Sequence, residues 1–246
     1  MAGLLGIGGG LIIVPALAYL FVNVPEALVM HMAVGTSLAV VTVTSISSTR
    51  SHHRRGTVRW DLWRLLAPGL VLGTSAGAFV ADQLPGDALK LFFAVFELLV
   101  ALHLAFGKQA QPATQMPSTY LTLTAAFLIG VVCAFAGVGG GIMIVPLLTW
   151  MRLPIKQAVS TSAACGFPIA LAGSIGFIAV GLNASEPLPA WSTGYIYWPA
   201  FLGFSTTSVL FAPLGAKIAH ALPATVLRRV FALFLLTLAV LMFIKG

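Results

Sequence analysis

Two glycine-rich stretches carry the groups from which an anion site can be built inside a membrane. Gly6–Pro15 reads GIGGGLIIVP and Gly137–Pro146 reads GVGGGIMIVP, with seven of the ten positions identical. Adjacent glycines weaken a helix, and a helix that starts after such a break points free N–H groups and a positive dipole end at it. The candidate ligand residues are the glycines Gly8, Gly9, Gly10, Gly139, Gly140 and Gly141.

A second repeated element follows each glycine stretch. Ala33–Ser37 reads AVGTS and Ala158–Ser162 reads AVSTS. Hydroxyls can donate hydrogen bonds to an oxyanion without adding full charge, so the candidates are Thr36, Ser37, Thr161 and Ser162. Two structural alternatives stay open: the glycines allow close helix packing, and the hydroxyls bond back to their own helices or cap them. A dinucleotide fingerprint is excluded because no βαβ unit surrounds either glycine run.

Two titratable residues are candidates for proton coupling. Glu97 lies in the middle of the apolar run 88–106, and an acid at membrane depth often serves in proton transfer. The alternative is a carboxyl group bonded to a neighbouring helix. His31 precedes the first AVGTS element, where it either faces a cavity entrance or lies at the membrane interface. No metal site is expected, since the adjacent His52 and His53 have no carboxylate or cysteine partner.

The composition is that of a membrane protein. Of the 246 residues, 59% are hydrophobic and only 8% are charged, and the mean hydropathy is +1.02, whereas a soluble domain carries about a quarter charged residues. Apolar runs of spanning length recur throughout the chain. The net charge is +7, and the basic residues lie mainly between apolar spans. This distribution fits membrane topology better than nucleic-acid binding. We therefore expect an all-α polytopic membrane protein embedded in a lipid bilayer.

The chain divides into two repeats joined by a linker. The second repeat, 118–246, shows five segments: 118–136, the half-length 142–151, 155–181 with a kink expected at Pro168, 197–217 and 223–244. The first repeat, 1–107, shows four counterparts, at 10–22, 30–49, 62–81 and 88–106, so its opening helix is short or missing. The linker 108–117 contains prolines and small polar residues.

Matched loops of the two repeats carry opposite charge. The Arg50–Arg64 loop has five arginines, but its counterpart 181–198 has no Lys or Arg. The 22–29 and 82–87 loops are acidic, whereas their counterparts are basic. Because cytoplasmic loops collect Lys and Arg, we expect two inverted-topology repeats whose broken helices meet near the midplane. This orientation makes the Arg50–Arg64 loop cytoplasmic and the C-terminus periplasmic or extracellular.

These motifs resemble the sulfite exporter TauE/SafE family, also called the toluene-sulfonate uptake permease superfamily. The resemblance rests on the two glycine-rich stretches, the two AV-x-TS elements and the basic loop at 50–59, and it covers nearly the whole chain. It implies a multi-pass carrier of a prokaryotic inner (plasma) membrane. It also implies a substrate that is a sulfur-containing anion, such as sulfite, sulfoacetate or another organosulfonate.

The sequence thus favours a secondary transporter, in the exporting direction, that works by alternating access at the glycine breaks. No nucleotide-binding motif is seen, and no cofactor or catalytic residue is expected. One alternative is a membrane-embedded enzyme, which would need a nucleophile–base pair or paired acids at depth. The other alternative is an anion channel, which would use the same motifs.

Overall fold

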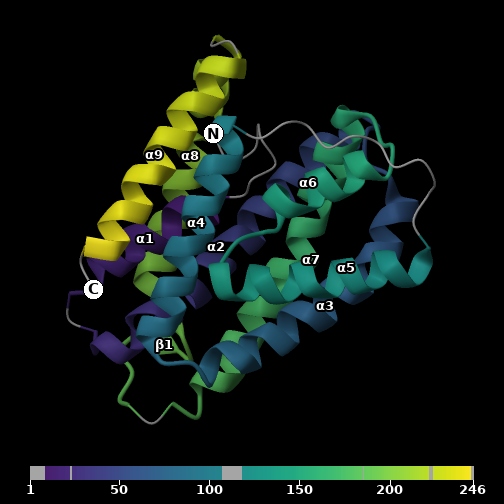
Figure 1. Cartoon of the computed structure of the whole chain (residues 1–246). Coiled ribbons are helices and arrows are strands. Elements are labelled where there is room, and N and C mark those ends of the chain that lie inside the picture. Colours follow the sequence, from purple (N-terminus) through teal and green to yellow (C-terminus); the bar gives the residue numbers. More distant parts are fainter. Residues whose placement is uncertain (1–8, 23, 107–117, 185, 222–223, 245–246) are drawn as a thin grey trace.

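The architecture is helical throughout the described part of the chain. A computed structural model describes residues 9–22, 24–106, 118–184, 186–221 and 224–244 (Figure 1). In order, the helices are α1 (Gly10–Leu20), α2 (Glu26–Arg54), α3 (Trp60–Asp82), α4 (Gly86–Phe106), α5 (Thr119–Ala136), α6 (Gly141–Trp150), α7 (Ile155–Gly181), α8 (Trp198–Ala221) and α9 (Ala224–Ile244). The strands β1 (Ser192–Thr193) and β2 (Ile196–Tyr197) form a small hairpin between α7 and α8.

Helix lengths divide into full and half spans. Among the described residues, α2, α3, α4, α5 and α7 are long and apolar enough to cross a membrane. The helices α1 and α6 have 11 and 10 residues, so each is about 15 Å long, roughly half the thickness of a hydrocarbon core. The expected all-α polytopic fold is confirmed, and so is the half-length segment after the second glycine break.

The arginine-rich loop is shorter than expected. The predicted loop Arg50–Arg64 is wrong in extent, because α2 continues to Arg54 and α3 begins at Trp60. Basic side chains near a helix C-terminus interact favourably with its dipole, and His52, His53 and Arg54 occupy the last turn of α2. The helix ends where Gly56 adopts φ +66°, the left-handed conformation that glycine tolerates.

The β hairpin was not expected from the sequence, because its strands have only two residues each. It pairs Ser192 with Tyr197 and Thr193 with Ile196. Gly194, at φ +53°, forms its turn, and a Cβ there would overlap the backbone carbonyl of Ile178. The hairpin is therefore pressed against the last turns of α7 and fixes the entry to α8.

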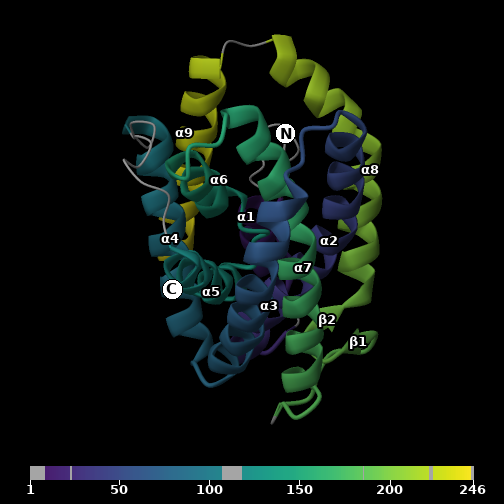
Figure 2. The same cartoon turned by 90° about the vertical axis from the view of Figure 1, so that its right-hand side faces the viewer.

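Helices from the two halves of the sequence interleave. The long helices α2 and α7 pack against each other, α1 packs on α2, and α6 packs on α7. Outside them α3 packs on α7, α8 packs on α2, and α4 pairs with α9 (Figure 2). The contacts α2–α7, α3–α7, α2–α8 and α4–α9 each join the first half of the sequence to the second. The glycine breaks therefore lie where α1, α2, α6 and α7 meet.

A glycine stripe fastens α5 to α3. Gly69, Gly73 and Gly77 recur at every fourth residue of α3, and α5 presents Gly130 to the same seam. A Cβ on Gly73 would overlap the carbonyl oxygen of Phe127, so the two backbones touch, as in small-residue packing between membrane helices. The sequence analysis missed this stripe, although its four-residue spacing was a usable signal.

Candidate functional site

Gly10, at the end of the first glycine stretch, meets the second break in the interior. Gly10 opens α1, and a Cβ there would overlap the carbonyl oxygen of Gly137 and stand 2.9 Å from Val138 Cα. Gly9 precedes it, partly buried, and every residue from Gly137 to Gly141 is buried. The predicted ligand Gly8 lies outside the described residues. The structure thus brings Gly10 to the second break.

The backbone of the second break depends on glycine. Gly137, at φ 62°, ends α5, and Gly140, at φ 76°, precedes α6; both are left-handed conformations that side chains strain. The Gly140 carbonyl accepts hydrogen bonds from the N–H groups of Met143 and Ile144. Within the described residues, no backbone carbonyl accepts from the N–H groups of residues 139–142. The start of α6 therefore offers free donors to the interior.

Ser37 links the first half of the chain to the second break. Its hydroxyl, fully buried on α2, donates a 2.8 Å hydrogen bond to the carbonyl oxygen of Gly137. The two residues are 100 positions apart. This bond satisfies a carbonyl group that the end of α5 leaves free, so Ser37 holds the break in place.

Thr36 and Thr161 perform matched tasks in opposite halves. The N–H of Tyr197, just before α8, donates a 3.0 Å bond to Thr36 Oγ1. The N–H of Arg59, just before α3, donates a 3.0 Å bond to Thr161 Oγ1. Both threonines are fully buried. Each hydroxyl therefore caps the start of a helix from the other half, a role that differs from the capping of its own helix weighed in the sequence analysis.

Ser162 has a different environment from its counterpart Ser37. Its side chain is fully buried, and its Oγ has no hydrogen-bond partner among the described residues. Gly166 lies one helical turn further along α7, where a Cβ would stand 3.3 Å from the carbonyl oxygen of Gly139. Residues four apart share a helix face, so Ser162 belongs to the face of α7 that looks toward the second break.

Glu97 lies away from the glycine breaks. It is fully buried on α4, and neither carboxyl oxygen has a hydrogen-bond partner among the described residues. No described residue of a neighbouring helix therefore bonds to this carboxyl group. Its neighbours on α4 are buried and apolar, with Phe93 one turn before it and Val100 one turn after.

His31 also lies apart from the breaks, in a cluster with Tyr195 and Asp82. Its ring nitrogens stand 3.1 Å from the carbonyl oxygens of Ala27 and Ala81, and its ring centroid lies 5.3 Å from that of Tyr195. The Tyr195 hydroxyl donates a 2.8 Å bond to Asp82. Burial, together with the neighbouring Asp82 carboxylate, raises the pKa of Tyr195 above its usual range.

A hydroxyl and imidazole network lies at the other end of α2. Ser160 Oγ stands 2.7 Å from the Thr57 hydroxyl and 3.1 Å from His52 Nδ1. Ser160 occupies the third position of the AVSTS element, where the first half has Gly35. Within the described residues, no group of three or more His, Cys, Asp or Glu side chains is placed to hold a metal ion.

Comparison with known proteins agrees with this architecture. Residues 1–242 match the family described as "Sulfite exporter TauE/SafE". The chain is 39% identical to a "Probable membrane transporter protein" of Haemophilus influenzae, with all of this chain and 94% of that protein covered. It is 29% identical to a probable membrane transporter protein of Methanocaldococcus jannaschii, with 89% of this chain and 81% of that protein covered.

A third relative is the "Probable membrane transporter protein YunE" of Bacillus subtilis, at 28% identity with 74% of each chain covered. No solved structure matches the chain. These names describe membrane transporters rather than enzymes, and the helices described above form a multi-pass membrane fold. On the match over residues 1–242, the chain belongs to the sulfite exporter TauE/SafE family.

Proposed function

We propose that the chain is a secondary transporter that exports a small sulfur-containing oxyanion, such as sulfite, sulfoacetate or another organosulfonate. The family description, "Sulfite exporter TauE/SafE", supports an anionic substrate of this kind. The relatives named as probable membrane transporter proteins support a carrier. The membrane would be the prokaryotic inner membrane.

The anion site would lie at the start of α6. The observation that carries this proposal is the buried hydroxyl of Ser162, which has no hydrogen-bond partner among the described residues. An unpaired buried hydroxyl is unfavourable, and an oxyanion oxygen would accept its hydrogen bond. Gly139, Gly140 and Gly141 add free N–H groups at a helix N-terminus, which favours anions. Gly8, Gly9 and Gly10 would contribute the matching end of α1.

The other three hydroxyls would position this site. Thr36, Ser37 and Thr161 each bond to backbone from the opposite half of the chain. These bonds fix the glycine breaks relative to α3 and α8. No Lys or Arg belongs to the repeated motifs. Neutral donors and helix dipoles would therefore hold the anion, which favours release as well as binding and avoids the cost of burying a full charge.

Two inverted repeats, 1–107 and 118–246, with the linker 108–117 between them, would supply alternating access. The reciprocal caps support this arrangement: Thr36 caps the start of α8, and Thr161 caps the start of α3. The opposite charge of matched loops supports inversion. In this orientation the arginines around 50–64 face the cytoplasm and the C-terminus lies outside. Movement of one repeat against the other would expose the site to each side in turn.

Calorimetric titration tests the site directly. Purified protein would be titrated with sulfite, sulfoacetate and, as a comparison, lactate. Ser162→Ala should weaken sulfur-anion binding by about 0.5–3 kcal/mol, the usual range for a hydrogen bond to a neutral or charged partner. The matched control is Ser174→Ala, because the short 2.7 Å bond of Ser174 Oγ goes to Ala170 in its own helix, and its contact with the Thr42 hydroxyl is long, at 3.5 Å. Unchanged affinity in Ser162→Ala would refute the proposed site.

A further inference from the structure

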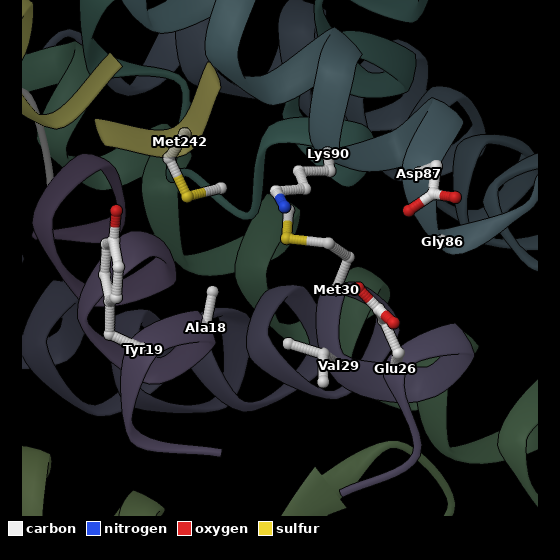
Figure 3. A pocket seen from close by; sticks show the side chains of 9 residues that line it. All are labelled: Ala18, Tyr19, Glu26, Val29, Met30, Gly86, Asp87, Lys90 and Met242. Atoms are coloured by element: carbon white, nitrogen blue, oxygen red, sulfur yellow. The ribbon is translucent and has the colours of Figure 1, made fainter. Parts of the chain in front are cut away.

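A cleft opens where the starts of α2 and α4 meet the ends of α1 and α9. It has a volume of about 210 Å³, and its lining includes Tyr19, Glu26, Asp87, Lys90 and Met242. Figure 3 shows the amine of Lys90 reaching between these elements, with the carboxylates of Glu26 and Asp87 on one side and the Tyr19 hydroxyl on the other. Charged and hydroxyl groups thus line the cleft together with apolar side chains.

Glu97 lies deeper on the same face of α4. Seven residues separate it from Lys90, which is about two full turns, or roughly 10 Å along the axis. Glu97 is the twelfth of the 21 residues of α4, close to the middle of the helix. A proton donor or acceptor that entered the cleft would therefore have to move about two turns inward to reach the carboxyl group.

Tyr19 brings α1 to the cleft. It lines the cleft from α1, which packs against α9, the partner helix of α4. The rest of the immediate packing on the α9 side is apolar, with Leu235 and Met242 buried there. Leu235 is the sequence counterpart of Glu97 in the second half, so the acid is present in only one of two matched helices.

Ionisable residues are sparse on the helices around α4. Among the described residues they include Tyr19 on α1, Glu26 and His31 on α2, Asp87, Lys90 and His103 on α4 itself, Tyr120 and Cys133 on α5, and Arg229 on α9. None of them forms a hydrogen bond or ion pair with the Glu97 carboxyl group. An ionised carboxylate in such packing is strongly unfavourable, so the packing seen here suits the neutral acid.

We infer that Glu97 is a proton-carrying site loaded from this cleft, and that its protonation couples proton movement to anion transport. This inference rests on the proposed transport function. The Glu97 carboxylate takes one proton from hydronium that enters the cleft and becomes a neutral acid, which allows α4 and α9 to close around it. Loss of the proton to water on the opposite side of the membrane restores the charge and favours the hydrated, opened arrangement. Because α4 and α9 come from opposite halves, this switch acts on their relative position.

The test uses full-length protein in liposomes that enclose a pH-sensitive dye. Sulfite counterflow at equal pH on both sides measures exchange, and net sulfite flux under an imposed pH difference measures coupling. For one proton per anion, each pH unit supports up to about tenfold accumulation. Wild type should move protons with sulfite. Glu97→Gln should keep counterflow and lose the response to the pH difference, whereas the exposed control Glu186→Gln should keep both.

The possible failures are distinguishable. Net sulfite flux in wild type without proton movement would overturn the coupling inference while leaving the transporter intact, and this result needs no variant that could misfold. A Glu97→Gln protein that still responds to the pH difference would overturn the role of Glu97. The absence of counterflow in wild type with sulfite and with sulfoacetate would refute the proposed function and the inference with it.

Discussion

The Ser37 hydroxyl donates a 2.8 Å hydrogen bond to the carbonyl oxygen of Gly137. Ser37 belongs to the repeated element of the first half, and Gly137 opens the glycine break of the second. The corresponding residue Ser162 has no such partner among the described residues. The same motif therefore braces the backbone in one copy and leaves a donor free in the other.

Ser37→Ala should destabilise the fold. The Gly137 carbonyl would remain buried without its hydroxyl donor, which costs about 1–3 kcal/mol. Thermal unfolding in detergent should show a lower midpoint than wild type. Ser174→Ala loses a bond internal to α7 and a long 3.5 Å contact with the Thr42 hydroxyl, and it should shift the midpoint less. Equal midpoints for the two variants would contradict the bracing role of Ser37.

Gly140→Ala should be more damaging than Gly56→Ala. Both glycines have positive φ, 76° and 66°, so alanine strains both by about 1–2 kcal/mol. At Gly140 a Cβ would also stand 2.7 Å from Ile169 Cδ1, whereas at Gly56 it meets nothing within 4 Å. Thermal unfolding would compare the two.

Gly140→Leu should still insert into the membrane but lose sulfite transport, and transport at the wild-type rate would argue against the glycine site.

Gly73→Ala should loosen the seam between α3 and α5. A methyl group there would overlap the Phe127 carbonyl. A methyl group on Gly203 of α8 would meet no described atom within 4 Å. We expect a clear drop in the unfolding temperature for Gly73→Ala and little change for the matched Gly203→Ala. A stable Gly73→Ala protein would show that the two backbones need not touch.

Tyr195→Phe should destabilise the protein equally from about pH 6 to about pH 9. The loss is the hydrogen bond to Asp82, worth about 0.5–3 kcal/mol. Because the pKa of Tyr195 is raised, its contribution is fully present below the ordinary tyrosine pKa of about 10 and is lost only as pH rises through the folded-state pKa. Unfolding midpoints across this pH range test the point, and a difference that disappears toward pH 9 would contradict it.

Local signals predicted much of the fold. The glycine runs end helices because Gly137 and Gly140 need left-handed backbone, and α6 was expected as a half span from its length. The boundaries of α2 were less accurate, since polar residues such as Arg54 continue a helix beyond the apolar run. Hydropathy alone marks only the apolar part of such a helix.

Contacts between residues far apart in the chain could not be predicted from the sequence. Tyr195 and Asp82 are 113 positions apart, and no local pattern pairs them. The difference between Ser37 and Ser162 could not be read from two nearly identical motifs, because it depends on which backbone each side chain meets. The burial of Glu97 without a hydrogen-bond partner among the described residues likewise depends on the packing of α4 against α9.

Counterflow of isotopically labelled sulfite into liposomes preloaded with unlabelled sulfite tests the central claim most directly. The account predicts transient, saturable accumulation in wild type. It also predicts that Ser162→Ala raises the half-saturating concentration by about one order of magnitude, as expected for the loss of about 1.4 kcal/mol of binding. Flux that never saturates and shows no counterflow, or wild-type saturation in Ser162→Ala, would contradict a carrier that binds its anion at this glycine break.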